Sequence, residues 1–254
     1  MNTRESLNPQ SDLKTDATHS VLESVISGLI EPRQDAPEIY KPTLISNRPG
    51  NLTMHDEISD ALTNSDSFDI SVAFVSPDAI LSLFEDFRSH HANAPEQVSR
   101  LITSTKNHFN DPRAFWELLH LQRTAGVDVR VWAGSDSSVS VAQGQPFHPK
   151  GYVFSRRMRN GTPYYDLFVG SSNLTGAALN TQREWNLKVS SLANGELVAQ
   201  VRDEIDSQIA DSKPLTEEWI KQYEEDFKKY APPRRDILKS LEGREIQPDR
   251  KSVV

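Results

Sequence analysis

The chain has 254 residues, which is enough for one large domain or for a domain with an appended helical piece. It contains no cysteine, which excludes disulfides, thiolate-bound zinc and a cysteine nucleophile, and its net charge of −8 restricts any nucleic-acid site to a local basic patch. Because no apolar run approaches the roughly 18 residues of a membrane span and the first residues lack a signal peptide's apolar core, we expect a cytoplasmic protein.

The N-terminal part of the chain contains helical and strand patterns in turn. Residues 1–20 are polar and aperiodic, which predicts a disordered or loosely attached segment, whereas residues 21–30 and 55–63 have apolar residues at helical spacing. Residues 68–75 are rich in β-branched and aromatic side chains, which predicts a strand. Ser76 and Pro77 then begin a helix that is expected to run to about residue 90.

The same scheme continues toward the C-terminus. The patterns first predict a strand (98–103), a helix (112–125, ending at Gly126), a strand (127–132) and a Gly/Ser-rich loop (134–146). They then predict strands over 147–154 and 165–170, a short helix (174–179), a strand (184–190), a helix (198–209) and a charged helix from Thr216. This alternation predicts an α/β fold with a mixed, mainly parallel sheet that is flanked by helices on both faces.

Polar side chains cluster at the ends of two of these predicted strands. His148 and Lys150 are two residues apart, so in a strand they lie on one face and can reach the same bound group. The second strand ends in Gly170, which permits a tight turn, followed by the short hydrogen-bonding side chains of Ser171 and Asn173. Together these polar groups suit a phosphate.

This HxK pattern followed by GSxN resembles the signature of the phospholipase D superfamily, and most of all its nuclease branch. Glu184 follows Asn173 where the bacterial nucleases of that family also carry a glutamate. The family's usual aspartate, a few residues after the lysine, is replaced by Ser155, and Asp166 comes only beyond an Arg-rich segment. The resemblance implies a phospholipase D-like fold, which we assign to residues 41–212.

The resemblance also implies a chemistry that needs neither a metal nor a cofactor. In the family two HxK motifs meet at one site, where one histidine attacks and forms a phosphohistidine while the other protonates the leaving group. Lys150, Ser171 and Asn173 are then expected to bind phosphate oxygens. Glu184 is expected to orient the histidine of a partner subunit. Because none of the other histidines is followed by a lysine two residues on, we expect a homodimer with one composite site.

A local basic segment lies next to the motif in the sequence. Between residues 148 and 159 the chain has no acid and carries Lys150, Arg156, Arg157 and Arg159, so we predict that the three arginines bind a phosphate backbone. A solvated hairpin tip is the equally weighted alternative. Trp132 and Trp185 are interpreted as aromatic residues of the core or of the site wall, and base stacking is the weaker interpretation.

Three functions fit these observations. A DNA nuclease is favoured by the single motif and the arginines, a non-catalytic nucleic-acid-binding module is disfavoured by the intact His148 and Lys150, and a lipid phosphodiesterase is disfavoured because an aromatic, Lys-rich membrane-facing helix is missing. The arrangement also resembles the N-terminal module before the motor of some bacterial DEAD/DEAH-type helicase and restriction proteins. In that interpretation residues 1–40 are an N-terminal extension and residues 213–254 a C-terminal helix and linker. No GxxxxGK[ST] loop of a motor occurs in the sequence.

Overall fold

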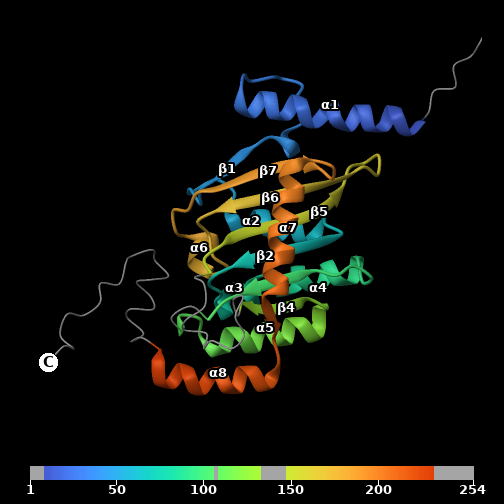
Figure 1. The fold of residues 1–254 in the computed structure, drawn as a ribbon. Coiled ribbons are helices and arrows are strands. Elements are labelled where there is room, and N and C mark those ends of the chain that lie inside the picture. The colour runs from blue at the N-terminus through green and yellow to red at the C-terminus, as the bar shows by residue number, and fades with distance from the viewer. Residues whose placement is uncertain (1–8, 106–107, 133–146, 232–254) are drawn as a thin grey trace, which may run out of the picture.

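The computed structural model describes residues 9–105, 108–132 and 147–231, with side chains from residue 16 onward. Within these residues the chain builds an eight-stranded sheet with the order β1-β7-β6-β5-β2-β3-β4-β8 (Figure 1). The strands are β1 (Thr43–Ile45), β2 (Ser67–Val72), β3 (Arg100–Thr103), β4 (Asp128–Trp132), β5 (Lys150–Arg157), β6 (Pro163–Gly170), β7 (Asn186–Leu192) and β8 (Ser212–Pro214).

The sheet is mixed, and most of its pairings are antiparallel. Only β2–β3 and β3–β4 are parallel, whereas every other neighbouring pair among the described strands runs antiparallel. The α/β fold class is therefore confirmed, but the prediction of a mainly parallel sheet is wrong. The reason is visible between β5 and β6, because the short turn over residues 158–162 can join only antiparallel neighbours.

The helices mostly match the predicted periodic segments, and two of the three expected caps form, whereas the Ser76 hydroxyl makes no hydrogen bond to its helix and accepts from the Gly176 backbone N–H at 3.2 Å. They are α1 (Pro9–Leu29), the 3-10 helix η1 (Glu38–Tyr40), α2 (Met54–Thr63), α3 (Pro77–Ser82), α4 (Phe84–Asn93), α5 (Pro112–Ala125), α6 (Gly176–Asn180), α7 (Glu196–Ala210) and α8 (Glu217–Tyr230). Thr216 accepts a hydrogen bond from the Trp219 backbone at the start of α8, as an N-cap does. Gly126 ends α5 with a φ of 63°, in the left-handed region that glycine tolerates.

Two helical predictions need correction. The single helix expected from Pro77 to about residue 90 is interrupted at the buried Leu83, which separates α3 from α4. Residues 9–20, predicted to be disordered or loosely attached, belong to α1. Ala17 of this helix is buried together with Met158 and Tyr164 near the turn between β5 and β6, so tertiary packing stabilises a segment that has a weak helical pattern of its own.

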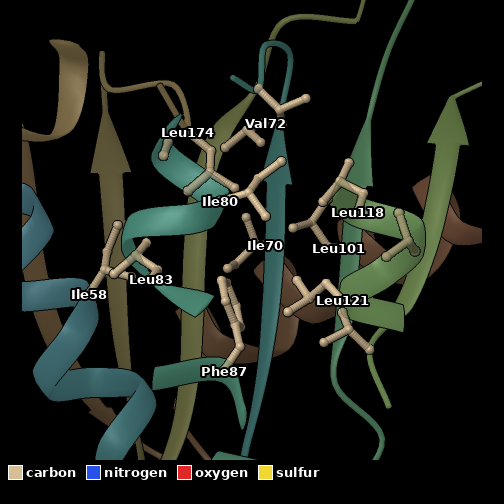
Figure 2. Close-up of a cluster of buried hydrophobic side chains, with 14 of the residues drawn as sticks. Ile58, Ile70, Val72, Ile80, Leu83, Phe87, Leu101, Leu118, Leu121 and Leu174 are labelled. Carbon is tan, nitrogen blue, oxygen red and sulfur yellow. The ribbon is translucent and has the colours of Figure 1, made fainter. Parts of the chain in front are cut away.

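The two faces of the sheet carry separate hydrophobic cores. The larger core lies between the sheet and helices α2 to α6, and Figure 2 shows the side chains of Ile70 and Leu101 from the sheet with Ile58, Phe87 and Leu118 from these helices. Helix α8 joins this core through the buried Ile220 and Tyr223. Helix α7 crosses the opposite face, where Val198 and Ile205 pack on side chains of the central strands (Figure 1). Helices therefore flank both faces, as predicted.

Crossing a membrane requires a helix that is both long and apolar, and no helix among the described residues meets both requirements.

Candidate active site

The candidate site lies where the ends of four neighbouring strands, β2, β5, β6 and β7, meet along one side of the sheet. Val72 at the end of β2 pairs with Lys150 at the start of β5, and Gly170 at the end of β6 pairs with Asn186 at the start of β7. Strands β5 and β6 are neighbours, so the HxK segment before β5 and the GSxN turn after β6 emerge side by side. The two sequence motifs are thereby brought to one edge.

His148 and Lys150 form a pair in this structure. The Lys150 Nζ atom lies 2.9 Å from Nδ1 of His148 and donates a hydrogen bond of 3.1 Å to the His148 carbonyl oxygen. The imidazole is exposed, and its ring stands edge-on to Phe74 with 5.7 Å between the ring centroids. The Lys150 ammonium group therefore lies beside an exposed imidazole. When that ring approaches a phosphorus atom, the ammonium group can donate to a phosphate oxygen.

The end of β2 holds both motifs in place. The backbone N–H of Ala73 donates to the Pro149 carbonyl at 3.1 Å, which ties down the HxK segment. The backbone N–H of Phe74 donates to Oδ1 of Asn173 at 3.2 Å, and the Phe74 carbonyl accepts from the Leu174 backbone at 3.1 Å. Because its Oδ1 is used in this way, the buried Asn173 can present only its NH2 group, a donor, to a phosphate oxygen.

Ser171 and Glu184 are hydrogen-bonded to each other. The Ser171 hydroxyl donates to the Glu184 carboxylate and accepts from the Trp185 backbone N–H at 3.0 Å. Since a hydroxyl carries one proton, Ser171 cannot donate to Glu184 and to a phosphate at the same time. In this structure the serine positions the glutamate of its own subunit, and phosphate binding by Ser171 stays a prediction.

Gly170 is required by the close approach of the next strand. A Cβ atom at this position would overlap the Trp185 carbonyl oxygen and the Cα atom of Asn186. The missing side chain lets the turn after β6 lie directly against the start of β7. Glu184 consequently reaches Ser171.

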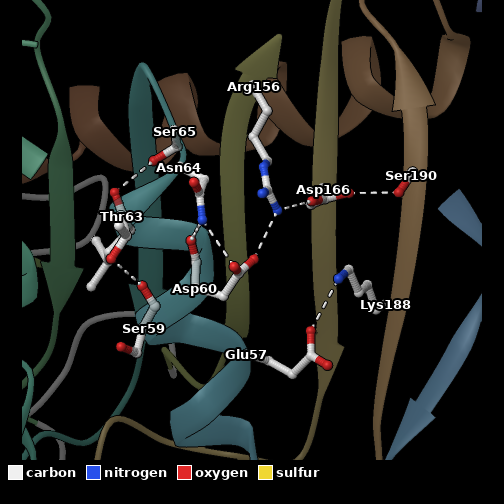
Figure 3. Close-up of polar contacts among 11 residues, drawn as sticks. Glu57, Ser59, Asp60, Thr63, Asn64, Ser65, Arg156, Asp166, Lys188 and Ser190 are labelled. Atoms are coloured by element: carbon white, nitrogen blue, oxygen red, sulfur yellow. Dashed lines mark hydrogen bonds and ion pairs between the residues drawn. The ribbon is translucent and has the colours of Figure 1, made fainter. Parts of the chain in front are cut away.

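The three arginines lie at the other end of β5. Eight residues of β5 separate the site from the hairpin tip, a distance of about 23 Å at roughly 3.3 Å per residue. Arg156 is buried between Asp166, at 2.9 Å, and Asp60, at 3.3 Å (Figure 3). The exposed Arg157 pairs with Asp66 at 2.8 Å, and Arg159 is exposed in the turn. The arginines therefore lie at the opposite end of β5 from His148 and Lys150, and Arg156 is paired with two carboxylates. Binding of a phosphate backbone by the three arginines stays a prediction.

The carboxylate of Asp166 serves the fold. It is fully buried in β6, where it pairs with Arg156 and accepts a hydrogen bond of 2.5 Å from the Ser190 hydroxyl (Figure 3). Ser155, at the family's usual aspartate position, pairs with Tyr165 in the same hairpin. Asp166 therefore neutralises a buried guanidinium and lies away from the candidate site.

Among the residues that the structure describes, no group of three or more His, Cys, Asp or Glu side chains could hold a metal ion. The donor set at the site, with one imidazole, one ammonium and one carboxylate bound to a serine, is suited to direct phosphate chemistry.

Comparison with known proteins gives this site a family. The family model described as "Cardiolipin synthase, PLD-like domain" matches residues 56–209, which is more than half of the chain and includes all of the motif residues. The chain belongs to this phospholipase D-like family. No curated protein matches the sequence.

Two solved structures resemble this phospholipase D-like chain. NucT from Helicobacter pylori matches with a TM-score of 0.50 and 14% identity, covering 68% of this chain and 98% of NucT. Nuc, a phospholipase D family member from Salmonella typhimurium, matches with a TM-score of 0.48 and 11% identity over the same shares of the two chains. At this identity the NucT likeness concerns the fold alone.

The phospholipase D-like site has supporting residues that the sequence motif did not reveal. The buried Tyr152 donates from its hydroxyl to the Ser172 carbonyl at 3.0 Å, and burial together with the Glu184 charge raises the pKa of this tyrosine. The amide of Asn186 bonds both the backbone and the hydroxyl of Ser172. Through these hydrogen bonds to Ser172, Tyr152 and Asn186 hold the GSxN turn in place. Only the strand alternation after His148 could have indicated Tyr152, and nothing local marks Asn186.

Asn110 is the third supporting residue that the motif did not indicate. Its Oδ1 accepts from the Val75 backbone at 3.0 Å, and its Nδ2 donates to the Ser104 carbonyl at 2.6 Å and the Ala73 carbonyl at 3.3 Å. The Tyr223 hydroxyl of α8 donates to the Asn110 carbonyl at 2.8 Å. Asn110 thus clamps the end of β2, which in turn holds both motifs.

Proposed function

We propose that this chain is a metal-independent phosphodiesterase, and more specifically a DNA nuclease that acts through a phosphohistidine at a site shared by two copies. The observation that carries the proposal is the shared attachment of both motifs to residues 73 and 74. Through it an exposed imidazole, an ammonium group and an amide donor gather at one sheet edge.

The reaction would proceed in two balanced steps. An imidazole nitrogen of His148 attacks phosphorus, the bond from phosphorus to the leaving oxygen breaks, and His148 of the partner subunit gives a proton to that oxygen. Water then attacks the phosphohistidine and loses a proton to the partner's His148, which releases the phosphate ester and restores both histidines. Lys150 and the Asn173 amide stabilise the negative charge that develops on the non-bridging oxygens.

A second copy is required because one HxK motif supplies only one histidine, and an exposed apolar patch lies beside the site. Val169 of β6 lies directly opposite Leu187 of β7, which lies opposite Leu44 of β1, and all three side chains are exposed. Directly opposite residues point to the same face of a sheet, so these three form a continuous patch that we call the β1-β7-β6 patch. We propose that it contacts the second copy, since it is continuous with the strand ends that carry Glu184 and Gly170.

The proposed link to a helicase or restriction motor rests on the resemblance in sequence organisation. Residues 232–254, where such a linker was expected, lie outside the described residues, whereas α8 before them packs in the larger core. A motor in the same or a partner chain therefore belongs to the proposal, and co-purification of the full-length gene product with an ATPase activity would test it.

The decisive experiment separates the three candidate functions in one assay. Purified protein is incubated in EDTA with supercoiled plasmid and, separately, with phosphatidylcholine vesicles, beside a His148→Ala variant and a His55→Ala control on α2. The proposal expects nicking of the plasmid that persists in EDTA, disappears in His148→Ala and is retained in His55→Ala.

The other outcomes contradict the proposal in different ways. Binding of plasmid without nicking by the unmodified protein would favour a non-catalytic nucleic-acid-binding module. Hydrolysis of phosphatidylcholine in the absence of nicking would favour a lipid phosphodiesterase, and nicking that EDTA abolishes would contradict the metal-independent mechanism.

A further inference from the structure

Trp185 combines a fixed backbone with an exposed ring. Its backbone N–H donates to the Ser171 hydroxyl at 3.0 Å and its backbone carbonyl accepts from the Ser171 backbone N–H at 3.1 Å, so both backbone polar groups of Trp185 are bonded to the GSxN turn. Its side chain is nevertheless 73% exposed, which excludes a role as a core residue. The residue before it in the chain is Glu184, which is expected to orient the histidine of a partner subunit.

An exposed tryptophan at this position resembles a binding surface more than a packing residue. Tryptophan has a large apolar face with one polar N–H, and such rings are rarely left open to solvent on a polar rim without a partner. Every nucleobase has a flat π-face, so a fixed aromatic ring binds unpaired bases with little dependence on sequence. A duplex does not offer these faces, because its bases are stacked on each other.

The charges around Trp185 suit a nucleic acid strand. Arg183 lies two residues before it and is exposed, so a guanidinium group and an indole flank the Glu184 carboxylate along the chain. An arginine can pair with a backbone phosphate while a neighbouring ring stacks on a base, which is the combination that single-stranded binding sites use.

We infer that Trp185 stacks on an unpaired base next to the scissile phosphate and that Arg183 contacts the adjoining phosphate. The site accordingly takes a nucleic acid strand whose bases are unpaired at the point of cleavage, which includes a strand of a supercoiled plasmid where its base pairs open transiently. This inference rests on the proposed function, and it names the form of the substrate. It makes Trp185 a determinant of substrate binding, whereas the β1-β7-β6 patch remains the proposed contact between copies.

The test combines removal of the ring with removal of the base. Binding of a fluorescent single-stranded oligonucleotide is measured in a His148→Ala background, with Trp185→Ala, Trp185→Phe and Tyr230→Ala, the last being an exposed aromatic control on α8. Trp185→Ala should weaken binding about tenfold, Trp185→Phe should restore most of it and Tyr230→Ala should have no effect. The protein with Trp185 intact should bind an oligonucleotide that is abasic at the cleavage point as weakly as Trp185→Ala binds the intact oligonucleotide. Combining the variant with the abasic oligonucleotide should cause no further loss of affinity.

The oligomeric state and the cleavage of nucleic acid in EDTA distinguish failure of this inference from failure of the proposed function. Light scattering should show the same oligomeric state for Trp185→Ala and for the unmodified protein, and a shift to monomers would overturn the inference by assigning the ring to the contact between copies. Unchanged affinity of Trp185→Ala, or additive losses with the abasic strand, would also overturn it. Loss of affinity in a protein that cleaves no nucleic acid in EDTA would instead support the stacking site while contradicting the proposed nuclease function.

Discussion

Phe74 donates its backbone N–H to Oδ1 of Asn173, and its ring stands edge-on to the imidazole of His148. One residue at the end of β2 therefore sets the positions of both signature motifs, which are connected in sequence only through the long β5–β6 hairpin. Because both contacts converge on one backbone segment, the geometry between the histidine and the amide is determined by β2.

Replacing Asn173 with aspartate tests the amide donor without removing its anchor. In Asn173→Asp one carboxylate oxygen can still accept from the Phe74 backbone, but the NH2 donor is lost and a negative charge faces the substrate phosphate. We expect phosphodiesterase activity to fall about 100-fold, the range for loss of one donor to a developing oxyanion. The thermal midpoint should change little, and a large loss of stability with unimpaired specific activity would show that Asn173 acts only in the fold.

The buried pair of Arg156 and Asp166 should contribute to stability and leave catalysis unaffected. Asp166→Ala leaves a buried guanidinium with only the more distant Asp60, so we expect a loss of about 3–5 kcal/mol in the free energy of unfolding measured with urea. Replacing both residues with leucine should cost less than Asp166→Ala alone, because no uncompensated charge remains. If the double variant is the less stable one, or if it loses DNA binding while folded, this structural role is wrong.

Gly170→Ala should displace the start of β7. The added methyl group would overlap the Trp185 carbonyl and the Asn186 backbone, so the strand must move and take Glu184 away from Ser171. We expect a fall in turnover larger than the fall in stability, measured as specific activity alongside thermal unfolding. Gly161→Ala, in the exposed turn of the same hairpin, has space for a methyl group, but its φ of 82° strains alanine, so this control should lose some stability and retain activity. Full activity in Gly170→Ala would contradict the requirement for this close approach.

The buried His90 should make the protein less stable in mild acid. Burial lowers the pKa of its imidazole below the ordinary value of 6.5, and the ring bonds the Leu62 carbonyl at 3.1 Å and the Ser99 hydroxyl at 2.9 Å. Below pH 6.5 the unfolded chain binds a proton that the folded chain resists, so the free energy of unfolding should be constant above this pH and fall as the pH drops toward the folded pKa.

The comparison of variants isolates this residue from other titrating groups. Burial also lowers the pKa of His108, which contributes in the same direction, so urea unfolding at pH 7.5 and pH 5.5 is compared between the unmodified protein and His90→Gln. The variant should lose less stability between the two pH values. An equal loss in both proteins would mean that His90 does not cause the acid sensitivity.

Local chemistry made much of this fold predictable. The capped ends of α5, the N-cap at Thr216 and the strand pattern on both sides of the motifs depend on neighbouring residues, and they appear where the sequence indicates. The direction of strand pairing depends on how distant segments meet, so the mainly antiparallel sheet and the short strands β1 and β8 could not be read from periodicity.

The site residues that belong to a motif of fixed spacing were predictable. The roles that depend on tertiary contacts between distant segments were not. His148, Lys150, Ser171, Asn173 and Glu184 occur at the same sheet edge because the motif order fixes which strand ends they follow. The pairing of Arg156 with Asp166 could not be read from the sequence, since it arises only when β5 and β6 pair beneath α2. The Gly/Ser-rich loop over 134–146 lies outside the described residues.

Mixing active and inactive subunits tests the shared site most directly. Unmodified chains and His148→Ala chains are unfolded together in equal amounts, refolded so that subunits redistribute, and assayed for plasmid nicking in EDTA at a fixed total protein concentration. If each active dimer needs both copies of His148, about one quarter of the activity of the unmodified protein should remain, because only that fraction of dimers has two intact histidines. Retention of about half, in proportion to the unmodified chains, would show that each chain works alone and would contradict the composite site.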